Sequence, residues 1–170
     1  VILGIFARLC EREKIESRFR TDLSYNWNGE SMMGIIIKSN MLPTERATYR
    51  LLVYCTASPD LRERAFSLNK PLAEKLLLLK PSTRTMRLDK CFNEIIDSLP
   101  EKPIIKDIDV LFNPAYKIDV FKMLTASCKR RKFDLVWSGK LEGNALTYSE
   151  EGLPDYHKYE IESYDIVCVE

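Results

Sequence analysis

Glycine is scarce in this chain of 170 residues, and the scarcity bears directly on nucleotide binding. A phosphate-binding loop of the pattern G-x-x-x-x-G-K-[ST] needs glycines, because they let successive backbone N–H groups curl round phosphates. Gly139 is the one glycine followed by a lysine, but Asp134 stands where the first glycine of the pattern belongs, and Leu141 follows the lysine. The sequence therefore has no such loop.

Histidine is nearly absent, and the cysteines are not closely paired. His157 is the single histidine, and no two of the five cysteines form a C-x-x-C pair. This spacing argues against a zinc knuckle, and no serine or acid stands at a recognisable triad spacing from His157. An odd number of dispersed cysteines is typical of reduced thiols, so we expect a cytoplasmic protein.

The chain also has almost no net charge and no long apolar run. The formal net charge is +1, so no overall field steers the chain to nucleic acid or to a membrane, and any basic surface must be local. The apolar start at residues 1–10 is too short to span a bilayer and has neither the basic lead-in nor the cleavage site of a signal peptide. We therefore predict no membrane partner.

The pattern of apolar residues predicts an α/β protein. Residues 1–48 show no strong periodicity and are set apart as an uncertain N-terminal segment, whereas residues 49–170 form the predicted domain. Strands are expected at 49–55, 103–112, 133–137 and 163–169, helices at 71–79, 85–99 and 116–129, and a hairpin at 140–148. Strands that alternate with helices favour a mainly parallel sheet flanked by helices, followed here by a β-hairpin.

The predicted strand 103–112 carries two acidic residues, Asp107 and Asp109. A carboxylate in a buried strand is costly without a partner, and in phosphate-handling proteins that partner is often Mg²⁺. Residues two apart in a strand face the same side, so both side chains could reach one ion. The alternative is structural: the two acids cap turns or pair with basic residues at a strand end.

Ligands of parallel sheets bind at the carboxyl ends of the strands, so residues 55–58, 107–113 and 138–139 are expected at one edge. Thr56 and Ser58 could offer hydroxyl groups there. Pro59 removes an N–H group and Asp60 would repel phosphate, which makes this stretch a poor substitute for a glycine-rich loop.

A basic run at residues 129–132, Lys-Arg-Arg-Lys, follows the second predicted helix. It could contact phosphates of DNA, or it could be a charged helix end favoured by the helix dipole. The tyrosines around His157 could stack bases, but packing of the sheet edge is the simpler interpretation, with His157 in a surface loop.

Four segments of the chain are informative together: residues 68–78, Ile105-Lys-Asp-Ile-Asp-Val-Leu-Phe-Asn-Pro114, Val136-Trp-Ser-Gly139 and Leu146-Thr-Tyr-Ser-Glu-Glu-Gly152. They resemble the BrxF family, the small P-loop proteins of type 3 BREX phage-exclusion systems. The resemblance implies a P-loop NTPase fold, ATP with Mg²⁺, other BREX proteins as partners and a role in antiviral defence. It makes Asp107 or Asp109 the Walker B acid, with Asp107 as the metal ligand, and gives Ser138 the place of a polar sensor.

The chain departs from that family in its missing phosphate loop. We therefore expect a nucleotide-binding subunit of a phage-defence system with weakened or absent hydrolysis, and leave open whether it is an enzyme. The alternatives are a non-enzymatic assembly subunit that keeps the fold, and a DNA-contacting module that uses Lys129, Arg130, Arg131 and Lys132.

Overall fold

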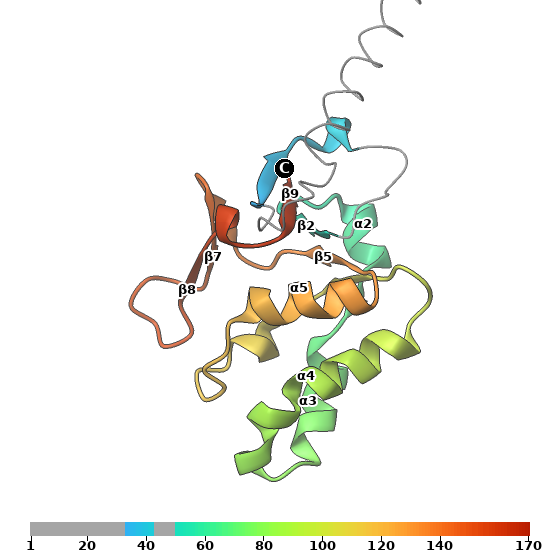
Figure 1. Cartoon of the computed structure of the whole chain (residues 1–170), viewed down its shortest axis with the longest axis vertical. Helices are drawn as coiled ribbons and strands as arrows, with labels where there is room; N and C mark the ends of the chain where they lie inside the picture. The colour runs from blue at the N-terminus through green and yellow to red at the C-terminus, as the bar shows by residue number, and fades with distance from the viewer. Residues whose placement is uncertain (1–32, 43–49) are drawn as a thin grey trace, which may run out of the picture.

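The computed structural model describes residues 33–42 and 50–170, and its central feature is a six-stranded sheet. Figure 1 shows three of its strands labelled, β2, β5 and β9. The strands lie in the order β1-β9-β2-β5-β4-β3, and every neighbouring pair is parallel. Their bounds are β1 Ile35–Ile37, β2 Leu51–Tyr54, β3 Phe66–Ser67, β4 Ile104–Lys106, β5 Asp134–Val136 and β9 Ile166–Val169. The predicted parallel α/β architecture is confirmed.

A smaller antiparallel sheet follows β5. Its strands are β6 (Lys140–Glu142), β7 (Ala145–Tyr148) and β8 (His157–Glu160), in the order β6-β7-β8. Gly143 sits in the β6–β7 turn with φ of +60°, a conformation that glycine adopts without steric cost. The predicted hairpin at 140–148 is thus confirmed. β8 was missed, because the sequence favoured a surface loop around His157.

In the described residues, four α-helices and three short 3-10 turns connect the strands. The helices are α2 Pro59–Arg64, α3 Asn69–Leu77, α4 Pro81–Ser98 and α5 Val120–Arg130, and the 3-10 turns are η1 Ser39–Met41, η2 Asp109–Phe112 and η3 Ile161–Ser163. Helix α4 forms where predicted, because its apolar residues recur every three or four positions. α4 begins at Pro81, four residues before the predicted start, since the first turn needs no N–H donor there.

Helices α3, α4 and α5 cover one face of the sheet. Alternate strand residues such as Val53, Ile105 and Leu135 are buried with Leu72 of α3 and Phe121 of α5 in one large core. The opposite face forms a second apolar cluster around Leu52, Tyr54 and Val167, against which Leu61 of α2 packs. The sheet is therefore apolar on both faces, as expected for a parallel sheet.

The acidic strand is the main error of the sequence-based prediction. β4 ends at Lys106, and neither acid lies in it. Asp107 adopts φ of +53°, which turns the chain out of the sheet, and Asp109 begins η2. The same-side argument for the two carboxylates is therefore wrong. β1 comes from the segment before residue 49 and pairs with β9 in the main sheet.

Candidate functional site at the carboxyl edge of the sheet

Three predicted site residues follow adjacent strands at the same edge. The register pairs Tyr54 of β2 with Val136 of β5, and Ile105 of β4 with Leu135 of β5. Thr56, two residues beyond Tyr54, therefore lies level with Ser138, and Asp107 follows directly on the other side of β5. The backbone N–H of Trp137 donates to the Tyr54 carbonyl at 2.9 Å, so the pairing continues beyond the strand ends.

Of the two predicted acids, Asp107 is the one whose carboxylate is available to bind a ligand. Its side chain is half-buried, and within the described ranges no hydrogen bond or ion pair holds its carboxylate. Its left-handed backbone is one that aspartate tolerates better than most residues. A partly buried, unpartnered carboxylate at a strand end is a candidate for binding a cation or a hydroxyl group.

Asp109 is committed to holding the fold together. One carboxylate oxygen accepts a 2.6 Å hydrogen bond from the Asn69 amide and the other accepts a 2.8 Å bond from the Tyr148 hydroxyl. The Asn69 carbonyl oxygen in turn accepts from the Val110 N–H. Asp109 therefore joins the start of α3, the η2 turn and the end of β7. This role is structural, but it differs from the alternative that the sequence left open, because Asp109 neither caps the η2 turn nor pairs with a basic residue.

The loop between β2 and α2 has little to offer a phosphate. Ser58 is the N-cap of α2, and its hydroxyl oxygen accepts the Leu61 N–H at 3.2 Å. Helix α2 starts with Pro59 and has six residues, ending at Arg64. The Thr56 hydroxyl is exposed. Of the two hydroxyl groups predicted here, that of Thr56 is free of such a capping role.

Two thiols meet beneath this loop, a contact that sequence reasoning missed. Cys55 follows β2, and Cys168 lies on the neighbouring strand β9, where it is paired with Val53. The pKa of the Cys55 thiol is lowered because Cys168 hydrogen-bonds to it, while that contact together with burial raises the pKa of Cys168. A signal existed in the sequence: both cysteines stand near the ends of predicted strands.

The side chains that could hold a metal at this edge are a carboxylate and two hydroxyl groups. Mg²⁺ uses such oxygen donors together with water and phosphate oxygens. Asp107 would supply the carboxylate, and Thr56 and Ser138 the hydroxyls. In residues 33–42 and 50–170, no cluster of three or more His, Cys, Asp or Glu side chains is placed to hold a metal alone. A metal at this edge would therefore need further ligands beyond these side chains.

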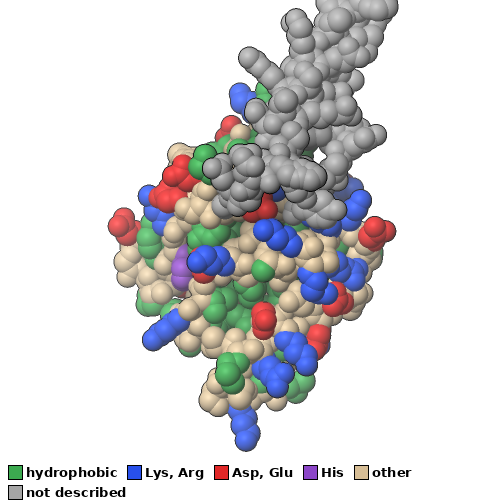
Figure 2. Space-filling model, viewed as in Figure 1, with side chains coloured by type: hydrophobic (Ala, Val, Ile, Leu, Met, Phe, Trp, Pro, Cys, Tyr) green, Lys and Arg blue, Asp and Glu red, His purple; other side chains and the backbone are tan. Residues whose placement is uncertain are grey.

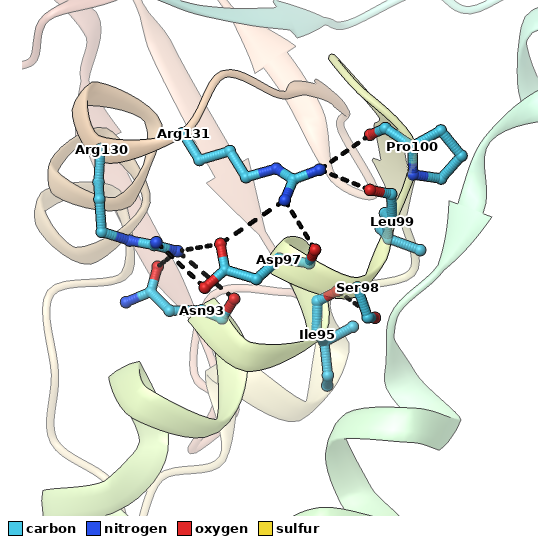
Figure 3. A network of polar contacts seen from close by, with 8 residues as sticks. All are labelled: Asn93, Ile95, Asp97, Ser98, Leu99, Pro100, Arg130 and Arg131. Carbon is cyan, nitrogen blue, oxygen red and sulfur yellow. Dashed lines mark hydrogen bonds and ion pairs between the residues drawn. The ribbon is translucent and has the colours of Figure 1, made fainter.

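The basic run at 129–132 forms part of the helix packing (Figure 3). Arg130 makes an ion pair with Asp97 at 2.9 Å and also contacts Asn93. The Arg131 guanidinium donates to the carbonyls of Asp97, Leu99 and Pro100 at the end of α4.

Lys129 lies 3.6 Å from Asp165, so a third member of the basic run also has an acidic neighbour within the fold. The structural interpretation as a charged helix end thus accounts for these contacts, and they give no support to a DNA site.

The predicted tyrosine cluster packs the small sheet against the main one. Phe112 stacks on Tyr148 with ring centres 3.8 Å apart and meets Trp137, His157 and Tyr159 edge to face. His157 lies in β8 and its Nδ1 lies 2.9 Å from the Asp155 carbonyl oxygen. The loop assignment of His157 was wrong, whereas sheet-edge packing of the tyrosines is what the ring contacts show.

Taken together, fold and site define an α/β protein with polar side chains at the carboxyl edge of a parallel sheet. Comparisons with protein-family models, with curated proteins and with solved structures find no match to this chain. Within the part of the chain that the structure describes, no helix has the length and apolar character needed to cross a membrane.

Proposed function

We propose that this chain is a P-loop-type subunit that binds a nucleotide weakly at the carboxyl edge of its sheet and has lost efficient hydrolysis. By its resemblance to the BrxF family, its setting is a bacterial phage-defence complex. The observation that carries the proposal is the order of the strands. Thr56, Ser138 and Asp107 follow the three neighbouring strands β2, β5 and β4.

The strand order supports a P-loop type of fold. If β2 is counted as the first strand, then β3, β4, β5 and β9 are the second to the fifth. Across the sheet these strands lie in the order fifth, first, fourth, third, second, and β1 is added at the edge beside β9. β5 thus separates the strand after which a phosphate loop would stand from the strand that Asp107 follows. A large class of P-loop NTPases has this order, with an additional strand between its phosphate loop and its Walker B acid. This is an analogy of fold, so the argument for function rests on the edge residues.

The same edge explains why hydrolysis is expected to be lost. Phosphoryl transfer depends on positioning the triphosphate and stabilising its charge, mostly by backbone N–H groups of a glycine-rich loop. Here that place holds Thr56 to Pro59, with one N–H missing at the proline and Asp60 following. Asp107, Thr56 and Ser138 could hold a hydrated Mg²⁺ with its nucleotide, but nothing in this loop replaces the phosphate cradle.

Calorimetric titration with ATP, with and without Mg²⁺, tests the proposal. We expect binding heat that requires Mg²⁺, and no phosphate release above the protein-free blank. Asp107→Asn should abolish the heat, because it removes the charge while suiting the left-handed backbone. Asp89→Asn on exposed α4 is the matched control and should bind like the unmodified chain. Absence of heat at millimolar ATP contradicts nucleotide binding.

A second candidate is an assembly subunit that has kept the fold and lost the ligand. The contacts of Asp109 favour it, since an acid from the motif that carries the family resemblance serves here to join α3, η2 and β7. Its test is co-purification with neighbouring defence proteins. Under this candidate, Asp107→Asn leaves the co-purified complex unchanged. Complex formation that depends on Mg-ATP and fails in Asp107→Asn contradicts it.

A further inference from the structure

The turn between α3 and α4 exposes large aliphatic side chains to an unusual degree. Leu77, Leu78 and Met86 are 67%, 88% and 73% exposed, whereas Leu76 and Leu88 beside them are buried in the core. We call residues 77–87 the α3–α4 tip. It lies at the end of the molecule away from β1 and the C-terminal residue (Figure 1). Core packing therefore does not account for these three side chains.

The α3–α4 tip is also strongly basic. Lys80, Arg84 and Arg87 lie within it, and the sequence from Leu76 to Leu88 contains no aspartate or glutamate. Figure 2 shows hydrophobic and basic side chains together at this lower end of the molecule. The net charge of +1 for the whole chain conceals this local excess of three positive charges. A partner for the tip must therefore be both apolar and anionic.

We propose that the α3–α4 tip docks on a lipid bilayer that carries anionic headgroups. Leu77, Leu78 and Met86 enter the boundary between headgroups and acyl chains, while the three basic side chains lie at the level of the lipid phosphates. Peripheral proteins combine buried apolar area with attraction to anionic lipid in this way. The sequence-based prediction of no membrane partner considered the overall charge and a spanning segment, neither of which bears on such a tip.

Two other occupants fit the tip less well. A second copy of this chain, related by a two-fold axis, would bring the same positive charges face to face, which costs energy. Single-stranded nucleic acid is bound with aromatic side chains that stack on bases, and residues 67–91 contain no aromatic residue. A bilayer satisfies the aliphatic side chains and the charges together, and it tolerates the convex shape of a helical turn.

Co-sedimentation of the whole chain with vesicles tests the proposal. We expect binding to vesicles of phosphatidylcholine mixed with phosphatidylserine, little binding to phosphatidylcholine alone, and release as salt is raised. Equal binding to both kinds of vesicle overturns the role of charge, and no binding to the anionic vesicles overturns the proposal. Nucleotide binding is measured separately at the carboxyl edge, so its presence or absence leaves this test unaffected.

Two double variants separate the apolar and the basic contributions. Leu77→Ser with Leu78→Ser, and Lys80→Glu with Arg87→Glu, should each lower the bound fraction by roughly tenfold or more. The matched controls change exposed residues elsewhere: Met33→Ser with Leu153→Ser, and Lys122→Glu with Lys140→Glu. Circular dichroism establishes that all four variants are folded. If the control pairs lose binding as strongly as the tip variants, the tip is not the docking surface.

Discussion

The Tyr148 hydroxyl donates a 2.8 Å hydrogen bond to Asp109, which ties the end of β7 to the turn that follows β4. Burial, together with this bond, raises the pKa of Tyr148, because the neighbouring carboxylate disfavours a second negative charge. The small antiparallel sheet is thereby fastened to the candidate ligand edge. Asp109 and Asp107, two residues apart, have separate roles: one supports the edge, and the other is free to meet a ligand.

Asp109→Ala should therefore lower the free energy of unfolding more than Asp107→Asn does. Loss of the Asp109 carboxylate leaves the Asn69 amide and the Tyr148 hydroxyl without their acceptor, and we expect about 1–2 kcal/mol less free energy of unfolding. Asp107→Asn removes no contact and suits a positive φ, so the change should stay within about 0.5 kcal/mol. Urea denaturation followed by circular dichroism measures both. Equal losses in the two variants would contradict the division of roles.

Gly139 should tolerate no side chain. It follows Ser138 at the carboxyl edge, and a Cβ placed there would meet the Thr147 carbonyl oxygen at 1.9 Å. Since that atom is backbone in β7, and the next residue, Lys140, pairs with Thr147, relief requires the start of β6 and β7 to move apart. We expect Gly139→Ala to cost more than about 2 kcal/mol in thermal or urea unfolding.

Gly143→Ala provides the comparison, because its Cβ would meet no atom within 4 Å and the cost is limited to the positive φ. That penalty is about 1–2 kcal/mol. A Gly139→Ala variant as stable as Gly143→Ala would mean that Gly139 and the Thr147 carbonyl do not approach as closely as the structure has them.

How much of this edge could be predicted from the sequence depends on whether the contacts that form it are local or join distant parts of the chain. The helix at 85–99 was predictable, because its apolar spacing is local. The break after Lys106 was not, since Ile105, Ile108 and Leu111 suit either a strand or a short 3-10 turn. The 3-10 turn is favoured by the contacts of Asp109 with Asn69 and Tyr148, which lie about forty residues away on either side. The place of β9 beside β2 is likewise a pairing between distant parts of the chain.

Arg131 should matter more for stability than the adjacent Arg130. The Arg131 guanidinium satisfies carbonyls at the end of α4, where the helix leaves its last acceptors without intrahelical donors, and its side chain is 28% exposed (Figure 3). We expect Arg131→Ala to lower the free energy of unfolding by about 1–3 kcal/mol. Arg131→Lys should recover part of it, because an ammonium group cannot reproduce the planar fork.

Arg130→Ala should cost less than about 1 kcal/mol, because the Arg130–Asp97 pair is nearly half exposed on both sides and is screened by solvent. Chemical denaturation of the three variants at low and high salt decides the order. A larger loss for Arg130→Ala than for Arg131→Ala would contradict the capping role.

Tyr164 makes the stability of the fold sensitive to alkaline pH. Its hydroxyl donates to Asp119 at 3.0 Å, and burial with this bond raises the pKa of Tyr164 to about 12 from its usual value near 10. The neutral phenol is favoured in the folded state. The stabilisation is therefore complete below about pH 10 and is lost as the pH rises from 10 towards 12. Asp119 also caps α5 through the Lys122 N–H, so the contact holds the helix start as well.

Urea denaturation at neutral pH and at about pH 11 measures this dependence. The unmodified chain should lose stability between the two conditions, and Tyr164→Phe should lose less, since phenylalanine has no proton to release. At neutral pH the variant should be weaker by about 1 kcal/mol for the lost hydrogen bond. The raised pKa values of Tyr148 and Tyr159 leave a remaining slope in the variant, so the difference between the two chains is the quantity to compare. Identical slopes would show that Tyr164 ionises alike in the folded and unfolded states, and that its contact with Asp119 does not form in solution.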